Sequence, residues 1–368
     1  MKKILITGTL GQDGANMAEY LLKQPDCEVY GMIRRSANPN YINTENFKKH
    51  KNFNFVFGDL TDANSLEKLV REIQPDYFIN FAANSFVGIS WDMPIHVMDV
   101  NTMGVLRCLE AIRKNKPDCR FYSAGSSEQY GDVDYSPQDI RHPMKPRSPY
   151  GASKCAAHHL VKVYRESYDM FAVHGILFNH EGTKRGEEFV TRKITKGVAR
   201  ICDTLRGADN WRRRRGEKAV FSPIELGNLD AKRDWSDSED FVEGVWLMLN
   251  QRAPKDYVLA SGETHSIREF VEKAFFYADL KGEWVGEGVE EEYIHFSGKD
   301  TNVLVKVNPD FYRPAEVELL LGESTPIREE LGWKPKNSFD MLVKKMVSYD
   351  IKDHHEEDLP FEMPDASK

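Results

Sequence analysis

The sequence predicts an α/β protein: a doubly wound parallel sheet joined to a smaller α/β domain in the C-terminal part. Over residues 1–180, apolar β-rich runs alternate with stretches that have the spacing of amphipathic helices. The strand-like runs are apolar throughout, so both of their faces must be covered by helices. The 368 residues are enough for one large domain or two ordinary ones.

The expected elements follow one another in a regular order. Helices are predicted at Asp13–Lys23, from Leu66 to Ile73 and at Val97–Ile112, where apolar residues recur on one helix face. The strands are predicted at Lys3–Gly8, Glu28–Ile33, Phe53–Gly58, Asp76–Ala83, Cys119–Gly125 and Phe171–Phe178. In such sheets ligands bind beyond the carboxyl ends of the strands.

The alternation ends near residue 180, which predicts a domain boundary. We assign 1–180 to the first domain, with a returning segment near 228–252. The second domain is assigned to 181–227 and 253–350. Residues 351–368 are polar and acidic, and we expect a loose tail there.

Composition excludes several functions. The chain has 50 basic and 58 acidic residues and a net charge of −8, which argues against binding nucleic acid or an anionic membrane. No apolar run approaches the ~20 residues of a membrane span. The basic run Arg212–Arg215 is interpreted as a solvated or intersubunit segment. Five widely spaced cysteines predict free thiols in the cytoplasm and no metal site.

A glycine loop lies between the first strand and the first helix. Gly8, Gly11 and Gly14 allow a tight turn and close backbone approach to a pyrophosphate, and the loop also contains Gln12 and Asp13. The position of this GxxGxxG loop predicts a Rossmann-type, dinucleotide-binding domain.

The second strand is followed by Arg34 and Arg35, where binders of NAD place an acid. Guanidinium groups suit a 2′-phosphate, so we predict NADP as the cofactor. After the third strand, Asp59 and Leu60 are placed for the adenine.

The fourth strand is followed by Ala82, Ala83 and Ser85, which are placed for the ribose and nicotinamide side of the cofactor. Their position at the same sheet edge as the glycine loop is the reason for this assignment.

Tyr150 and Lys154 open a helix and share one of its faces. An ammonium group beside a phenol stabilises the phenolate, and we expect it to lower the tyrosine pKa from ~10. The pair would then act as a general base for a sugar hydroxyl.

Ser126 and Glu128 follow the fifth strand. The serine is placed to hydrogen-bond a carbonyl oxygen. The glutamate could take a C–H proton and return a proton to a leaving hydroxyl. Elimination needs this extra acid and base, whereas simple dehydrogenation does not. The alternatives are an NADP-dependent nucleotide-sugar epimerase or reductase, and a sensor with an inherited site.

Through these motifs and several further segments, the chain resembles the GDP-mannose 4,6-dehydratase family of extended short-chain dehydrogenase/reductases. The resemblance runs from Ile4 to about Tyr349. It is carried by the segments 11–14, 34–35, 146–150, 177–181, 189–194, 226–235 and 311–317.

The resemblance implies a lyase reaction on GDP-mannose with internally recycled hydride. NADP⁺ would take hydride from C4 of mannose while Tyr150 takes the hydroxyl proton. Glu128 would remove the C5 proton and protonate the departing C6 hydroxyl, with Ser126 holding the oxygen. Hydride would return to C6, giving GDP-4-keto-6-deoxymannose.

The resemblance also implies binding residues and assembly. Lys154, His180 and Arg185 fall at positions that hold the cofactor. The positions that contact the GDP-sugar are Ser85, Asn179, Val190, Lys193, Arg233, Arg313 and Glu316. The family suggests a homodimer or homotetramer.

Three departures from the family pattern leave the sugar open. Phe86 stands where histidine is frequent, His96 where tyrosine is typical, and residues 236–238 replace Gly-His-Ala. We expect these to alter the shape of the sugar pocket, and a related GDP-sugar such as GDP-manno-heptose remains an alternative substrate.

Overall fold

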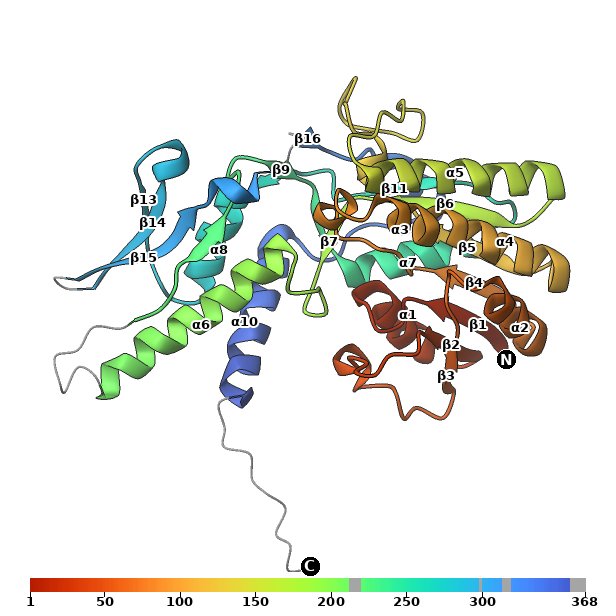
Figure 1. Cartoon of the computed structure of the whole chain (residues 1–368), viewed down its shortest axis with the longest axis horizontal. Helices are drawn as coiled ribbons and strands as arrows, with labels where there is room; N and C mark the ends of the chain where they lie inside the picture. Colours follow the sequence, from red (N-terminus) through yellow and green to blue (C-terminus); the bar gives the residue numbers. More distant parts are fainter. Residues whose placement is uncertain (212–219, 298–299, 313–318, 358–368) are drawn as a thin grey trace, which may run out of the picture. The chain divides into compact units, whose positions relative to one another are not determined.

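The largest sheet has seven strands in the order β11–β6–β5–β4–β1–β2–β3 (Figure 1), and all of them except β11 come from the first half of the chain. The computed structural model describes residues 1–211, 220–297, 300–312 and 319–357. All neighbouring strands of this sheet are parallel. The order reverses at β1 and β4, which creates the switch point where Rossmann-type sheets bind ligands. The predicted fold class is confirmed.

Six strands of this sheet, β1 to β6, and the helices α1, α2, α4 and α5 lie at or near predicted positions, whereas β11, α7 and α9 were not predicted as elements. The strands are β1 (Lys2–Thr7), β2 (Cys27–Ile33), β3 (Phe53–Phe57), β4 (Tyr77–Asn80), β5 (Arg120–Ala124), β6 (Ala172–Leu177) and β11 (Tyr257–Leu259). The helices are α1 (Gln12–Leu22), α2 (Ala63–Ile73), α3 (Pro94–Met98), α4 (Gly104–Asn115), α5 (Pro149–Tyr168), α7 (Ser238–Leu249) and α9 (Thr325–Leu331).

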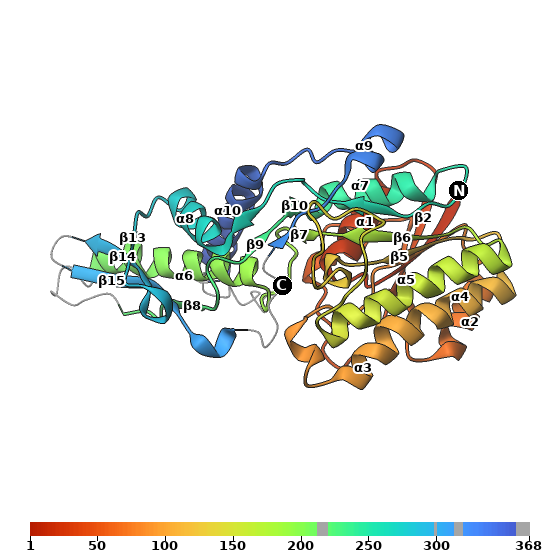
Figure 2. The same cartoon turned by 90° about the horizontal axis from the view of Figure 1, so that it is seen from above.

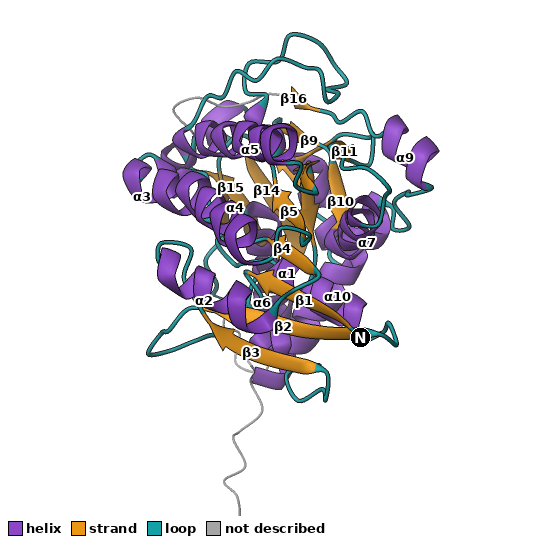
Figure 3. Ribbon diagram, turned by 90° about the vertical axis from the view of Figure 1, so that its right-hand side faces the viewer, coloured by secondary structure: helices purple, strands orange, loops and turns teal. Residues whose placement is uncertain are grey.

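β1 shows why this sheet is covered on both faces. Ile4 and Ile6 pack into the cluster formed with α1 and α7, whereas Leu5 packs into the cluster formed with α2, α4 and α5. Side chains alternate across a strand, so both faces are apolar. Burying each such side chain contributes about 1.5–3 kcal/mol. Figure 2 shows α1 and α7 on one side of the sheet, and Figure 3 shows α4 and α5 on the other.

Helix starts follow from the local sequence. Asp62 precedes α2 and accepts a hydrogen bond from the backbone N–H of Asn64 at 3.0 Å. Ser148 precedes α5 and accepts one from Gly151 N at 3.0 Å, and Pro149 occupies the first helical position. These caps satisfy N–H groups that have no partner within the helix.

The predicted helix at Val97–Ile112 is correct in extent but is not uniform. A π-helical segment at Asp99–Met103 separates α3 from α4. In this wider turn Asn101 is buried and bonds both backbone groups of Asn84, at 2.8 and 3.1 Å, and Ser153 Oγ at 3.0 Å. Periodicity does not reveal a single wide turn, because the apolar spacing continues on both sides of it.

The chain divides into two units. Unit 1 contains 1–186, 231–265 and 313–339, and unit 2 contains 187–230, 266–312 and 340–368. The observed division therefore differs from the assignment of 253–350 to the second domain, since β11 completes the large sheet. Its three residues are too short to show a strand pattern in the sequence.

Unit 1 also contains short strands outside the large sheet. β10 pairs in parallel with β7, and β16 pairs in parallel with β9. These strands are β7 (Asn179–Glu181), β9 (Lys232–Arg233), β10 (Trp235–Asp237) and β16 (Leu319–Leu320), and β12 (His265–Ser266) lies at the boundary of the unit.

Unit 2 contains a four-stranded sheet in the order β13–β14–β15–β8. β13, β14 and β15 are antiparallel, and β15 pairs in parallel with β8. Helices α6 and α8 pack together. The elements are α6 (Val190–Trp211), β8 (Ile224–Leu226), α8 (Ile267–Tyr277), β13 (Glu283–Val285), β14 (Glu292–Ser297), β15 (Asp300–Val307) and α10 (Phe339–Glu357).

The prediction of a loose tail from residue 351 is wrong for the first seven residues of that segment, which are helical. Residues 351–357 belong to α10, and 358–368 lie outside the described residues. Asp350 anchors α10: its buried carboxylate lies 2.7 Å from Arg192 and 2.6 Å from Thr195 Oγ1, both on α6. Because the residues near the C-terminus are mostly polar, the sequence pattern did not indicate this buried ion pair.

Candidate active site

The glycine loop between β1 and α1 has the shape expected for a phosphate cradle. Gly8 has φ +72°, and a Cβ at Gly14 would lie 2.3 Å from Gly8 O. Gly11 N–H donates to Gly8 O at 2.9 Å. The backbone is packed so closely that side chains are excluded, and the first N–H groups of α1 lack helical partners.

His180 on β7 contacts Asp13 at the start of α1, and this contact ties β7 to the glycine loop. Asp13 Oδ2 lies 3.0 Å from His180 Nε2, and His180 Nδ1 lies 2.7 Å from Phe178 O. Burial opposes the charge of Asp13, but His180 and Arg185 outweigh it and lower the Asp13 pKa. Burial likewise opposes protonation of His180, while Asp13 raises its pKa. The predicted cofactor residues Asp13 and His180 therefore contact each other.

Gln12 and Arg185 complete the surroundings of the loop. Gln12 Nε2 donates to His180 O at 3.0 Å, whereas Gln12 Oε1 is buried with no partner among the described residues. Arg185 forms an ion pair with Glu181 at 3.1 Å. An unpartnered polar atom beside a cradle of glycines fits a bound dinucleotide.

The other predicted cofactor residues lie at the same edge of the sheet. Arg34 and Arg35 are exposed after β2. The Asp59 carboxylate accepts hydrogen bonds from Thr61 N and Oγ1 at 2.9 and 2.8 Å. Leu60 is buried in the core.

The segment after β4 reaches the same edge. Ala82 N donates to Thr7 Oγ1 at 3.0 Å, which ties this segment to β1. Ala83 is half-buried and Ser85 is exposed. β4 ends at Asn80, three residues before the predicted end.

Tyr150 and Lys154 lie together on α5, as their spacing predicts. The Lys154 Nζ atom is 5.8 Å from the centre of the Tyr150 ring and donates to Ala124 O at 2.8 Å. The side chains are only 7% and 6% exposed. The Ser126 side chain lies near the Tyr150 hydroxyl, where it favours the phenolate and opposes a rise in the Tyr150 pKa.

Glu128 stands beside this pair. Its side chain is half-buried, and its backbone N–H faces Ser126 Oγ at 3.3 Å. A Cβ at Gly151 would lie 2.6 Å from Glu128 O, so the start of α5 packs directly against this turn. The structure thus brings together all four residues that the sequence predicted as catalytic.

The Tyr150 pKa is raised, whereas the sequence predicted that it would be lowered. Burial raises the pKa of Tyr150 to about 12, opposed by the Ser126 hydrogen bond and reinforced by Glu128. Burial lowers the pKa of Lys154 to about 8. The expectation that Lys154 lowers the tyrosine pKa is wrong for this structure, because both groups are removed from water and desolvation dominates.

Two predicted substrate residues of unit 1, Asn179 and Arg233, are on its short strands. Asn179 opens β7, and its Oδ1 is buried without a partner among the described residues. Arg233 is buried on β9, with Nη1 2.9 Å from Lys232 O. Arg313, Glu316 and the run Arg212–Arg215 lie outside the described residues.

Unit 2 contains two more predicted substrate residues. Val190 begins α6, and Lys193 follows one turn later. Lys193 Nζ lies 3.9 Å from the centre of the Phe311 ring. Burial lowers the Lys193 pKa, and Glu225 opposes this effect.

Residues 236–238, expected to alter the sugar pocket, have structural contacts. Asp237 caps α7 by accepting from Glu239 N at 2.9 Å. Ser238 Oγ accepts from Asn16 Nδ2 at 2.8 Å and so joins α7 to α1. Phe86 is exposed and His96 is half-buried.

The structure also reveals a buried polar network that the sequence did not indicate. His158 on α5 has its Nε2 atom 3.3 Å from Asp256 Oδ2. Arg165 binds both oxygens of Asp256, at 2.7 and 2.8 Å, and His174 N–H donates to Oδ1 at 2.7 Å. These residues come from distant segments, so no local pattern predicts their meeting.

We predict that Asp256→Asn destabilises the protein by about 3–5 kcal/mol, as breaking a buried ion pair does. Burial raises the Asp256 pKa, but Arg165 and His158 outweigh it, so the net shift is downward. The stabilisation is therefore present above the unfolded pKa of ~4 and is lost as pH falls toward the folded pKa. Chemical denaturation at several pH values would measure this, with exposed Asp26→Asn as the control.

No group of three His, Cys, Asp or Glu side chains with the geometry of a metal site occurs among the described residues. All five cysteines are unpaired, four of them buried and Cys155 partly buried. Within the same described parts of the chain, no helix is long and apolar enough to span a membrane.

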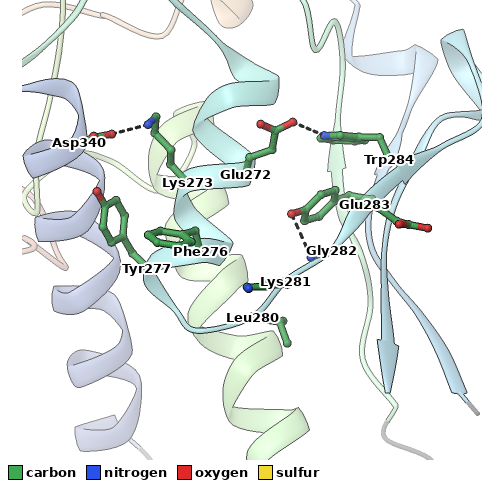
Figure 4. Close-up of a pocket in the computed structure, with 11 residues that line it drawn as sticks. Glu272, Lys273, Phe276, Tyr277, Leu280, Lys281, Gly282, Glu283, Trp284 and Asp340 are labelled. Carbon is green, nitrogen blue, oxygen red and sulfur yellow. Dashed lines mark hydrogen bonds and ion pairs between the residues drawn. The ribbon is translucent and has the colours of Figure 1, made fainter. Parts of the chain in front are cut away.

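A hollow of about 560 Å³ occurs in unit 2, between α8, β13 and the start of α10 (Figure 4). Its polar side chains pair with one another: Lys273 with Asp340 at 2.6 Å and Trp284 Nε1 with Glu272 at 2.9 Å. None of the predicted site residues lines this hollow.

Solved structures of similar fold share the architecture. A dTDP-glucose 4,6-dehydratase from Bacillus anthracis in complex with NAD has a TM-score of 0.76 and 19% identity, covering 96% of this chain and 98% of its own. RMD from Pseudomonas aeruginosa, complexed with NADPH, has a TM-score of 0.72 and 20% identity, covering 96% and 100%. At these identities the likeness shows the fold alone.

Sequence comparison identifies the family. The profile described as GDP-mannose 4,6 dehydratase matches residues 5–346. GDP-mannose 4,6 dehydratases from Drosophila melanogaster and Homo sapiens are 43% and 42% identical, covering 95% and 94% of this chain and 86% and 91% of their own. The GDP-mannose 4,6-dehydratase of Yersinia enterocolitica is 41% identical, covering 95% and 94%. The chain therefore belongs to the GDP-mannose 4,6-dehydratase family.

Proposed function

We propose that this protein is an NADP-dependent GDP-mannose 4,6-dehydratase, which converts GDP-mannose to GDP-4-keto-6-deoxymannose without net redox change. One observation carries the proposal: a second acid/base, Glu128, stands partly buried beside Ser126 and against the start of α5, the helix that carries Tyr150. Simple oxidation of a sugar hydroxyl requires only Tyr150. Loss of water requires a further group that moves a proton between carbon and oxygen.

The cofactor would be held by the predicted residues at the sheet edge. The glycine cradle suits a pyrophosphate, and exposed Arg34 and Arg35 suit a 2′-phosphate. When bound, a nicotinamide cofactor supplies the chemistry of accepting a hydride and returning it. The predicted cofactor residues are Gly8, Gly11, Gln12, Asp13, Gly14, Arg34, Arg35, Asp59, Leu60, Ala82, Ala83, Ser85, Lys154, His180 and Arg185.

Tyr150 would act first, by taking the proton from the sugar 4-hydroxyl as C4 is oxidised. Burial disfavours its phenolate, because it raises the Tyr150 pKa to about 12. The ammonium of Lys154 would favour the phenolate at the moment of proton transfer. Ser126 would hold the same oxygen through its hydroxyl.

Glu128 would act second. The C4 ketone acidifies the C5 hydrogen, and the Glu128 carboxylate would take that proton. The electron pair then forms the C5–C6 double bond as the C6–O bond breaks, and Glu128 returns the proton to the leaving hydroxyl to give water. One carboxyl group thus serves as base and then as acid. When the hydride returns to C6, C5 must regain a proton, and the proton that Tyr150 took from the 4-hydroxyl would balance it, so that the products are the 4-keto-6-deoxy sugar and water.

Basic side chains would bind the GDP part of the substrate. Arg233 and Lys193 can neutralise a diphosphate, and Glu316 could accept hydrogen bonds from guanine. The remaining proposed substrate residues are Ser85, Asn179, Val190 and Arg313.

Mass spectrometry of products from a panel of GDP- and UDP-hexoses and heptoses would test the function. We expect a product lighter by one water from GDP-mannose. Turnover only with a GDP-manno-heptose would move the proposal to that substrate. The absence of any dehydrated product, from folded protein with cofactor bound, would refute it.

Cofactor preference gives a separate prediction. We expect Arg35→Ala to weaken NADP⁺ binding about 10–100-fold, because a charged hydrogen bond to the 2′-phosphate is lost. Binding of NAD⁺, which lacks this phosphate, should be unchanged. Calorimetry would measure both, with exposed Arg71→Ala as the control. Equal effects on the two cofactors would contradict the assignment of Arg35 to the 2′-phosphate.

We also propose a homodimer or homotetramer, by analogy with the family, which light scattering would test. A cytoplasmic location is proposed because the five cysteines remain unpaired thiols.

A further inference from the structure

We propose that Gln129 is a positioning residue that holds Ser126 and Glu128 in place, and that the buried His158, His174 and Asp256 determine its orientation. This inference rests on the proposed function for its kinetic consequence. Its structural part stands on the network itself, in which a fully buried side-chain amide bonds the backbone of the catalytic turn.

The Gln129 side chain folds back onto the first residue of its own turn. Its Oε1 accepts a hydrogen bond from Ser126 N–H at 3.0 Å, and Ser126 Oγ accepts from Glu128 N–H at 3.3 Å. This is a capping box, in which the first and last side chains of the turn bond each other's backbone. The Gln129 amide therefore holds the backbone of Ser126 directly and that of Glu128 through the Ser126 hydroxyl.

His174 binds the same oxygen. Its Nε2 lies 3.0 Å from Gln129 Oε1, and its Nδ1 is buried with no partner among the described residues. Burial, reinforced by His158, holds the His174 pKa far below its usual range, so the ring is neutral. A neutral ring has one N–H, and the geometry places it on Nε2, donating to Gln129.

His158 binds the other end of the amide. Gln129 Nε2 lies 3.5 Å from His158 Nδ1, while His158 Nε2 faces Asp256 Oδ2 at 3.3 Å. The rings of His158 and His174 stack with centres 4.7 Å apart. Rotating the amide by half a turn would place its NH₂ group against the N–H groups of Ser126 and His174, so only one orientation satisfies all partners.

Gly125, which precedes the turn, has no room for a side chain. A Cβ at Gly125 would lie 2.3 Å from His174 Nε2 and 2.7 Å from Gln129 Oε1. Without the amide, the part-buried Ser126 N–H would lose its partner, which we expect to displace the turn. Tyr150 is held separately by α5, so we expect water loss to suffer more than sugar oxidation.

Hydrogen exchange of the unliganded full chain tests the structural part. We compare Gln129→Met with Gln138→Met, because Gln138 is also fully buried and bonds Leu321 N at 2.9 Å and Tyr135 O at 3.2 Å. We expect exchange of the backbone around Ser126 to rise about tenfold or more in Gln129→Met only. Equal exchange in wild type and Gln129→Met, or an equal rise in both variants, would overturn the proposal. His158→Phe, which keeps the ring stacking, replaces Gln129→Met if that variant does not fold.

Turnover of GDP-mannose tests the kinetic part. We expect Gln129→Met to lower kcat about 10–100-fold, with KM within about threefold, and to accumulate enzyme-bound reduced cofactor. Gln138→Met should leave kcat within about threefold. A kcat for Gln129→Met equal to that of Gln138→Met would overturn the positioning role. If wild type makes no keto product, the proposed function fails, and the exchange result still decides the role of Gln129.

Discussion

Replacing Glu128 with glutamine is expected to lower kcat for GDP-mannose about 10³-fold, within the range for loss of a general acid or base. Glutamine keeps the size and polarity of the side chain but cannot take the C5 proton or protonate the leaving hydroxyl. The side chain is only half-buried, so we expect the fold and the binding of NADP⁺ to be unaffected.

The same variant should separate the two halves of the reaction. Tyr150 remains intact, so sugar oxidation proceeds and reduced cofactor accumulates on the enzyme, which rapid-mixing absorbance would detect. Glu166→Gln, an exposed glutamate on α5, should retain wild-type turnover. Unchanged turnover in Glu128→Gln would instead favour the epimerase or reductase.

Tyr150→Phe is expected to lower kcat by about the same 10³-fold, but without accumulation of reduced cofactor. The phenol would be lost as proton acceptor, so oxidation at C4 stops before water loss begins. The ring is buried and only one oxygen is removed, so we expect the melting temperature to change little. Steady-state kinetics and rapid-mixing absorbance would measure both results.

Tyr122→Phe is the matched control for this experiment. Tyr122 is also a buried tyrosine of unit 1, and its hydroxyl finds no hydrogen-bond partner among the described residues. Removing that hydroxyl should leave kcat within about threefold. Tyr150→Phe with near-normal turnover would show that another group accepts the proton.

The predicted fold was correct wherever the pattern was long. β1 is apolar at consecutive positions that alternate between two opposite clusters, and α2 has its apolar residues on one face. The errors lie in short or irregular pieces. β11 has three residues, and α10 continues into residues 351–357, where the sequence predicted a tail.

The candidate site was predictable to the extent that its residues are close in sequence. Tyr150 and Lys154 are one helical turn apart, and Ser126 and Glu128 belong to one turn. The position of both segments beyond β5 and at the start of α5 follows from strand order, which explains why four separate predictions meet in space.

By itself, the sequence determined the parallel sheet, the glycine loop and the spacing of the proposed catalytic side chains, because periodicity, turn chemistry and helical spacing act over a few residues. Only the tertiary structure decided which buried groups meet: Asp13 with His180, and Gln129 with His158 and His174. It also decided the pKa of Tyr150, which burial raises to about 12. Desolvation and long-range hydrogen bonds depend on the path of the whole chain, and no local pattern encodes them.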